Sequence, residues 1–346
     1  MATTGGAAPK TNRLGLTKKE YGGVVSTMCK GCGHDRTSEA IIEAAYRNGV
    51  DPKEVIKMSG IGCSSKTPAY FLGSAFGFNG THGRMPSFAT GAHMANHVML
   101  PIGVSGDGDT ASIGMGQFVH MIRRNPNFTY VVENNGVYGL TKGQFSATAD
   151  KDSPNKRGLH PTEQPIDLCA LAVQLGCSFV ARSFSGDKKQ LIPILQAALA
   201  HEGMSFIDVI SPCVTFNNHD SSTKSYTYHK EHEVHFHDPS FVPHFEHIDV
   251  EYEEGTTTEV TLHDGSRLLL TKLENAFDPT DRQKALATLE TTRAKNEILT
   301  GLIHFAPGTP TLAQTLGLGD QAIADRPDDE LRPPASFLDN VLGAYG

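Results

Sequence analysis

Two short runs of residues in the middle of the chain have the composition of a phosphate and cation site. Gly106-Asp107-Gly108-Asp109 follows one apolar segment, and Asn134-Asn135-Gly136 follows the next. Glycines let backbone N–H groups approach a phosphate closely, and a helix that starts there turns its positive end toward the anion. A carboxylate beside a phosphate needs a cation between them, and Mg2+ shares its oxygen ligands between protein and phosphates. The pattern therefore predicts Mg2+ held by Asp107, Asn135 and the Val137 carbonyl.

Four of the six cysteines lie in predicted loops and form a second candidate site: Cys29, Cys32, Cys63 and Cys213. The first two make a C-x-x-C hook, which directs two sulfurs toward one point. Four thiolates suit either Zn2+ or an iron–sulfur cluster, and a structural zinc site usually has two hooks where this set has one. A cluster is therefore favoured over zinc, and unligated cysteines remain a third option. Cys169 and Cys177 lie in or beside an apolar helix and are expected to be small buried residues.

The elements that would position these groups alternate between strands and helices. Strands at 101–105 and 128–133, joined by a helix at about 112–124, make a βαβ crossover with parallel strands. Both polar runs then leave the carboxyl ends of neighbouring strands, where open α/β sheets bind ligands. The sequence thus predicts an α/β fold with a parallel sheet, helices on both faces and an extended C-terminal tail. Further helices are expected at 35–48, 68–76, 90–99, 166–175, 187–200 and 281–302, further strands at 55–59, 178–181 and 205–210, and an Asp-Gly hairpin within 259–270.

Composition limits the class of protein. The chain has 346 residues and a formal net charge of −8, which argues against nucleic acid or an anionic membrane as a partner. It has no apolar run of membrane-spanning length and no secretory signal at its start, so a cytoplasmic location is expected. Three parts are predicted: an N-terminal arm at 1–27, a cofactor-binding domain at 28–218, and a C-terminal extension at 219–346 that packs on the core and on partner subunits.

The ordered motifs CKGCGH, GIGCSS, THGR with ATG, GDGD, ENNGVYGLTKGQ and SPC span about 28–217. In this order they resemble the β subunit of a 2-oxoacid:ferredoxin oxidoreductase, and GDGD followed by NN resembles the thiamine diphosphate–magnesium signature. The resemblance implies a thiamine diphosphate-binding fold, with Mg2+ and a [4Fe-4S] cluster on the four loop cysteines. It also implies an α subunit in an α2β2 heterotetramer, which supplies the activating glutamate, and ferredoxin as electron acceptor.

The reaction that the resemblance implies is a CoA-dependent oxidative decarboxylation of a 2-oxoacid, reversible as CO2 fixation. A lysine in TKGQ resembles the members that use 2-oxoglutarate, whose second carboxylate needs a cation, so 2-oxoglutarate to succinyl-CoA is the expected conversion. The expected catalytic residues are Lys66, Lys142, His82 and Arg84, although Lys66 and Lys142 fit solvated surface lysines equally well. The expected cofactor contacts are Ile61, Gly62, Cys63, Ser64, His82, Gly106, Asp107, Gly108, Asp109, Asn135, Val137, Gly139, Leu140 and Thr141.

Three classes of function remain open on the sequence alone. The first is the oxidoreductase subunit, with pyruvate or another 2-oxoacid as the alternative substrate. The second is a non-oxidative thiamine diphosphate decarboxylase or synthase whose cysteines bind zinc or nothing. The third is a non-catalytic scaffold for an iron–sulfur cluster. In the tail, the histidines between His229 and His237 are interpreted as a solvated segment rather than a metal site, because their spacing suits no single face of a helix or strand.

Overall fold

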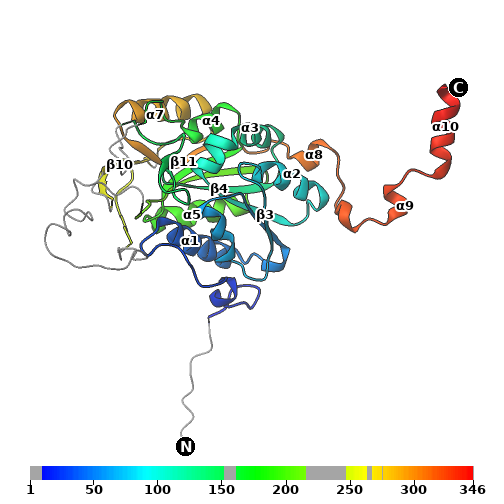
Figure 1. Ribbon diagram of the computed structural model, residues 1–346, viewed down its shortest axis with the longest axis horizontal. Helices are drawn as coiled ribbons and strands as arrows, with labels where there is room; N and C mark the ends of the chain where they lie inside the picture. The colour runs from blue at the N-terminus through cyan, green and yellow to red at the C-terminus, as the bar shows by residue number, and fades with distance from the viewer. Residues whose placement is uncertain (1–9, 152–160, 216–246, 263–266, 275, 346) are drawn as a thin grey trace, which may run out of the picture.

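A computed structural model describes residues 10–151, 161–215, 247–262, 267–274 and 276–345. Its centre is a nine-stranded sheet in the order β2-β1-β3-β4-β8-β7-β11-β10-β9, with helices on both faces (Figure 1). The strands are β1 (Val55–Ser59), β2 (Phe76–Asn79), β3 (Leu100–Gly106), β4 (Phe128–Asn134), β7 (Phe179–Phe184), β8 (Met204–Ile210), β9 (Thr257–Thr261), β10 (Arg267–Lys272) and β11 (Ile298–Phe305). A separate hairpin pairs two short antiparallel strands, β5 (Val137–Tyr138) and β6 (Gln144–Phe145).

The strands from β2 to β7 pair in parallel, as the βαβ pattern predicts. β4 lies at the centre and is buried along its length except for Asn134. Past β7 the direction changes, because β11 pairs with β7 antiparallel and β9 pairs with β10 antiparallel. The segment from Thr257 to Phe305 therefore adds three strands to the same sheet as the cofactor-binding region.

Two apolar layers cover the sheet. One face packs against α1 (Gly33–Asn48) and α5 (Lys188–Ala200), with Ile41 and Leu195 among the residues at that contact. The other face packs against four helices around Phe118, Tyr130 and Phe206. These are α2 (Met85–Ala95), α3 (Met115–Arg124), α4 (Leu168–Gln174) and α7 (Arg282–Ala294). Shorter helical turns are η1 (Lys18–Tyr21), η2 (Pro52–Glu54), η3 (Cys63–Ala69), the π-helix η4 (Gly108–Ile113) and η5 (Ile323–Asp325).

Several predicted helices differ from the structure. Residues 68–76 are not a continuous helix, because η3 ends at Ala69, Leu72 takes a left-handed φ of +46° and β2 begins at Phe76. The helix expected at 90–99 begins earlier, at Met85, with Pro86 in its first turn, where proline is tolerated. The helix expected at 112–124 is divided at Gly114 into η4 and α3.

The helix expected at 281–302 was predicted too long. It ends at Ala294, and Asn296 takes a left-handed φ of +58°, which breaks the helix before β11 begins at Ile298. The Asp-Gly hairpin is confirmed by the β9–β10 pairing, although the turn itself lies outside the described residues. The histidines between His229 and His237 also lie outside them.

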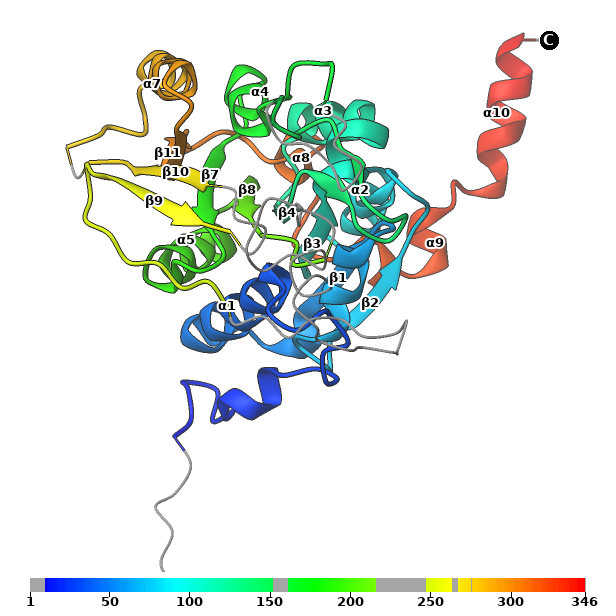
Figure 2. The same cartoon turned by 60° about the vertical axis from the view of Figure 1, so that its left-hand side comes forward.

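The C-terminal tail leaves the body of the molecule, as Figures 1 and 2 show. It was expected to be extended from Ala306, and it carries α8 (Leu312–Thr315), α9 (Asp328–Leu331) and α10 (Ala335–Tyr345). Phe337, Leu338 and Leu342 of α10 are more than half exposed.

Candidate active site

Asp107 and Asn135 lie side by side because β3 and β4 are adjacent parallel strands. Gly106 at the end of β3 pairs in register with Glu133 of β4, so both polar runs leave the same edge of the sheet. The backbone N–H of Asn135 donates to Asp107 Oδ1 at 3.3 Å. The structure thus brings together the two residues that the sequence assigns to Mg2+, through the Asn135 backbone, and their role as metal ligands stays a prediction.

The carboxylate of Asp107 is buried, with 1% of its surface exposed. Burial raises its pKa, while hydrogen bonds from Ser146 and Thr148 oppose that rise because they favour the charged form. Both hydroxyls contact Oδ2, Ser146 Oγ in a short hydrogen bond and Thr148 Oγ1 at 2.8 Å. These two residues were not singled out in the sequence, where the only signal is that both are hydroxyl residues in the polar stretch after TKGQ.

The turn after Asp107 has room only for glycine. A Cβ on Gly108 would lie 2.6 Å from the ring of Tyr138, whose hydroxyl donates to the Gly108 carbonyl at 3.1 Å. A Cβ on Gly106 would lie 3.1 Å from Ser64 Oγ. Asn135 Oδ1 accepts the backbone N–H of Val137 at 3.1 Å, which orients the amide. A glycine turn with nearby carboxylate, amide and carbonyl oxygens fits a diphosphate bridged by Mg2+.

Asp109 anchors the two loops beside this turn. Its Oδ1 accepts the backbone N–H of Ile61 at 3.2 Å, the backbone N–H of Gly83 at 2.7 Å and a short hydrogen bond from His82 Nδ1. Its Oδ2 accepts Ser105 Oγ at 2.9 Å. The sequence did not predict this anchoring role, and the assignment of Asp109 to the cofactor stays a prediction.

The residues expected to act on substrate surround the turn at different depths. His82 is half-buried, and its ring makes an edge contact with that of Tyr138 at 6.1 Å between centroids. Lys142 is exposed at the tip of the β5–β6 hairpin with a φ of +74°, next to the expected contacts Gly139, Leu140 and Thr141. Lys66 is exposed on η3, and Arg84 hydrogen-bonds Gln117 of α3 at 3.1 Å. His82 is thus the closest of the four to the Asp109 anchor.

Two of the loop cysteines each have their pKa raised by burial and by another cysteine of the set, so the members of each pair lie near each other. Burial raises the pKa of the Cys32 thiol well above its usual range, with the neighbouring Cys213 adding to it, and burial together with Cys29 raises the pKa of Cys63. The loop after β8 meets the C-x-x-C hook directly, since Gly33 N–H donates to the Pro212 carbonyl at 3.2 Å.

The spacing of these thiols bears on what they could hold. Among the described residues, no three Cys, His, Asp or Glu side chains gather closely enough for a single metal ion. The four thiols come from three loops with no disulfide among them, and the group that they hold stays a prediction.

A buried acid separates the glycine turn from the thiols. Glu133 is fully buried, its Oε2 accepts Thr67 Oγ1 at 2.9 Å, and its Oε1 has no partner among the described residues. Burial raises its pKa well above the usual range. His34 Nδ1 lies 3.7 Å from Glu133 Oε2 and 2.6 Å from Ser211 Oγ, and burial lowers the pKa of His34 to about 4. Sequence reasoning missed this group, because nothing local marks a glutamate before Asn-Asn-Gly as buried.

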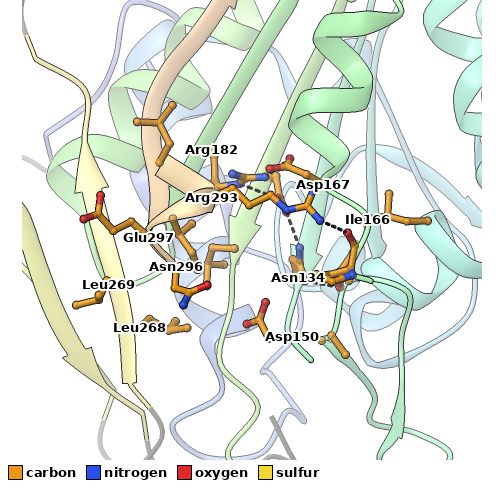
Figure 3. A pocket seen from close by; sticks show the side chains of 18 of the residues that line it. Asn134, Asp150, Ile166, Asp167, Arg182, Leu268, Leu269, Arg293, Asn296 and Glu297 are labelled. Atoms are coloured by element: carbon orange, nitrogen blue, oxygen red, sulfur yellow. Dashed lines mark hydrogen bonds and ion pairs between the residues drawn. The ribbon is translucent and has the colours of Figure 1, made fainter. Parts of the chain in front are cut away.

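A cavity of about 1020 Å3 opens beside the same strand ends and reaches α7 and β11 (Figure 3). On its wall the buried Arg182 guanidinium pairs with Asp167 at 2.5 Å and with Asp208 at 2.8 Å. Asn134 Nδ2 donates to Asp208 Oδ1 at 3.1 Å, which connects this ion cluster to the strand end that carries Asn135. The cavity wall and the glycine turn are therefore parts of one polar region.

Within the described residues, no helix is both long enough and apolar enough to cross a membrane.

Comparison with known proteins places residues 60–209 in the family described as "Thiamine pyrophosphate enzyme, C-terminal TPP binding domain". A 2-oxoacid:ferredoxin oxidoreductase subunit beta from Saccharolobus solfataricus is 43% identical over 199 residues, which are 57% of this chain and 65% of the relative. The 2-oxoglutarate synthase subunit KorB of Methanocaldococcus jannaschii is 34% identical over 190 residues, which are 55% of this chain and 70% of the relative. Several of the curated relatives are matched over just under two thirds of their length.

The likeness to one solved structure extends over nearly the whole chain. It is a 2-oxoglutarate:ferredoxin oxidoreductase from Magnetococcus marinus with 2-oxoglutarate, coenzyme A and succinyl-CoA bound. The TM-score is 0.71 at 25% identity, over 98% of this chain and 99% of that one. The segment after Thr257, in which the sequence shows no motif of the family, is therefore included in the structural match.

Proposed function

This chain belongs to the family of 2-oxoacid:ferredoxin oxidoreductase β subunits, and on that premise we propose that it binds thiamine diphosphate and carries out CoA-dependent oxidative decarboxylation of a 2-oxoacid together with an α subunit. The observation that carries the proposal is the placement of Asp107 and Asn135 on adjacent strand ends, beside a turn that admits only glycine. Thiamine diphosphate supplies an electron sink for decarboxylation when it is bound. The residues at the end of β3 and of β4 would hold its diphosphate.

The oxygen ligands proposed for Mg2+ are Asp107, Asn135 and the Val137 carbonyl. Within the part of the chain that the structure describes, Asp107 Oδ2 accepts from two hydroxyls, whereas Oδ1 accepts the Asn135 N–H at a long 3.3 Å. Oδ1 is therefore the oxygen best able to accept a cation. The remaining proposed cofactor contacts, including Gly62, Ser64 and Leu140, lie on the loops that border the same turn.

The four loop cysteines are proposed to hold a [4Fe-4S] cluster, which would pass electrons singly to ferredoxin. The support is that the loop after β8 meets the C-x-x-C hook through the Gly33–Pro212 hydrogen bond, and that Cys32 lies near Cys213 and Cys63 near Cys29. The choice of a cluster over zinc rests on the resemblance to the family. Burial raises the pKa of Cys32 and of Cys63, so these two sulfurs become thiolates more readily when a cationic group shares their charge.

Iron and acid-labile sulfide per chain, measured after anaerobic purification with the visible spectrum, test the cluster. We expect about four of each per chain in the wild type and loss of both in Cys213→Ser. Cys169→Ser is the matched control, because Cys169 is buried against the sheet and away from the loops. Zinc, or no metal in protein never exposed to air, would contradict the cluster and leave the non-oxidative thiamine diphosphate enzyme as the better proposal.

We propose 2-oxoglutarate as the substrate and Lys142 as a residue that selects it. Lys142 is exposed at the tip of a hairpin whose base touches the glycine turn through Tyr138, and we propose that its ammonium meets the second carboxylate of the substrate. Turnover of 2-oxoglutarate and of pyruvate by the complete enzyme is compared in wild type and Lys142→Ala. Lys53→Ala is the control, because Lys53 is exposed on η2 at the opposite end of β1 from the site. A fall of the 2-oxoglutarate to pyruvate ratio of about tenfold or more is expected for one lost ion pair. An unchanged ratio excludes this role for Lys142.

The proposed function also requires a second subunit. The activating glutamate of the aminopyrimidine is proposed to come from the α subunit of an α2β2 assembly, so the isolated β chain should be inactive. Activity recovered only when the two subunits are combined would support this, and 2-oxoacid-dependent dye reduction by the β chain alone would contradict it. Dye reduction by the assembled protein also separates the enzyme from a non-catalytic cluster scaffold.

A further inference from the structure

The segment that follows β6 is attached to the candidate metal ligand by two hydroxyls. Ser146 Oγ and Thr148 Oγ1 both donate to Asp107 Oδ2, and Ser146 is buried. Neither residue belongs to the set expected to touch the cofactor or Mg2+. Both contacts use the oxygen of Asp107 that does not face Asn135.

The same segment carries the hairpin whose tip is Lys142. Ser146 N–H donates to the Gly136 carbonyl at 3.0 Å, and Ala147 N–H donates to Ser112 Oγ at 3.0 Å. The two hydroxyls thus attach one end of the β5–β6 hairpin to the end of β3, where Asp107 lies. A shift of the Asp107 carboxylate would be transmitted to the hairpin through these bonds, because a buried carboxylate with two hydroxyl donors moves together with them.

The proton of Thr148 has three acceptors within reach, one of which is Ser146 Oγ at 2.9 Å. Its Oγ1 lies 2.8 Å from Asp107 Oδ2 and 2.9 Å from Asn134 Oδ1, and a hydroxyl carries a single proton. The ionised carboxylate is the stronger acceptor, so the Thr148 hydroxyl donates its proton toward Asp107 Oδ2 while that group is charged. Asn134 in turn donates to Asp208 of the buried Arg182 cluster, which fixes the amide from the other side.

We propose that Ser146 and Thr148 are positioning residues, which hold the Asp107 carboxylate for Mg2+. Through them, the placement of the β5–β6 hairpin depends on whether the metal site is occupied. The inference rests on the proposed function and deepens it, since it names residues that tie the diphosphate site to the segment proposed to select the substrate. Outer hydrogen bonds to a metal-binding carboxylate typically change metal affinity by about tenfold to hundredfold.

The test uses the full chain assembled with its α subunit and compares Thr148→Val with wild type. The first measurement is the Mg2+ concentration at which half of the added thiamine diphosphate is retained on ultrafiltration, which we expect to rise about tenfold or more in the variant. The second is hydrogen exchange of peptides from 136–149 with and without Mg2+ and thiamine diphosphate. Exchange should slow on loading in wild type and change little in Thr148→Val.

Three further variants make the result specific. Ser112→Ala is the matched control, because Ser112 Oγ accepts from the same segment but does not contact Asp107. Thr148→Ser keeps the hydroxyl and should restore both measurements. Ser146→Ala removes the other donor and serves as the second test if Thr148→Val does not fold.

The outcomes separate this inference from the function on which it rests. A wild type that retains no thiamine diphosphate at any Mg2+ concentration overturns the proposed function and the inference together. A wild type that retains it, with Thr148→Val and Ser146→Ala showing the same Mg2+ dependence and the same slowing of exchange, overturns the inference alone. An effect of Ser112→Ala as large as that of Thr148→Val also overturns it, because the hydroxyls would then act only on the local structure.

Discussion

Replacing Asp109 by asparagine tests whether this buried carboxylate organises the loops of the site. The side chain is 3% exposed and accepts four donors, from Ile61, His82, Gly83 and Ser105. Asparagine has nearly the same shape but only one acceptor oxygen and no charge. The substitution therefore changes the hydrogen bonding of the site with little change in its volume.

The loss in the free energy of unfolding can be worked out from the arrangement of these donors. If the amide oxygen replaces Oδ1, the contacts from Ile61, His82 and Gly83 survive but lose their charge, and a neutral hydrogen bond has about half the strength of a charged one. With charged bonds worth roughly 1.5–3 kcal/mol, three such bonds lose about 3 kcal/mol in total. The amide nitrogen then faces Ser105 Oγ, which can turn its own proton toward the Tyr130 hydroxyl at 3.3 Å.

Urea unfolding followed by circular dichroism, on anaerobic protein without cofactor at pH 7, measures this loss. We expect Asp109→Asn to lower the free energy of unfolding by about 3 kcal/mol, and Ser105→Ala by about 1 kcal/mol because it removes one donor only. A loss below about 1 kcal/mol in Asp109→Asn would refute the reasoning, since a carboxylate that anchors two loops cannot be neutralised at so small a cost.

Three further substitutions probe other parts of the molecule. His93 is buried without a hydrogen-bond partner among the described residues, and burial lowers its pKa to about 4. The unfolded chain therefore takes up the proton first, and wild type should lose about 2 kcal/mol more stability than His93→Gln between pH 7 and pH 5 in urea titrations. Gly108→Ala should abolish thiamine diphosphate binding in calorimetry, because the new Cβ would meet Tyr138 at 2.6 Å, whereas Gly91→Ala, with open space around it, should bind normally. Arg182→Met leaves the buried Asp208 and the partly buried Asp167 without their cation and should cost about 3–5 kcal/mol in chemical unfolding; a cost below 1 kcal/mol would contradict the ion cluster.

Local patterns in the sequence were sufficient for the central crossover. The apolar segments before GDGD and before Asn-Asn-Gly are β3 and β4, and they pair in parallel, so the adjacency of Asp107 and Asn135 could be predicted. This worked because the connection between two parallel strands constrains which strand ends meet. The same reasoning failed at 281–302, where leucines at helical spacing continue into β11. The helix stops because of the backbone conformation of Asn296, which periodicity does not show.

The composition of the site could be read from residue types, whereas its hydrogen bonding depended on the fold. Short motifs mark the glycine turn, the candidate Mg2+ ligands and the four loop cysteines. Their residue types indicate the chemistry of the site without knowledge of the fold. The anchoring of two loops by Asp109, the hydroxyls of Ser146 and Thr148 on Asp107, and the burial of Glu133 join residues that are 26 to 66 positions apart. Such contacts depend on how loops from different strands fold over one another. The sequence thus determined which chemical groups are present at the strand ends. The tertiary structure decided which of these groups hydrogen-bond to one another and which remain available to a ligand. The reason is that burial and hydrogen-bond geometry are properties of the packed chain.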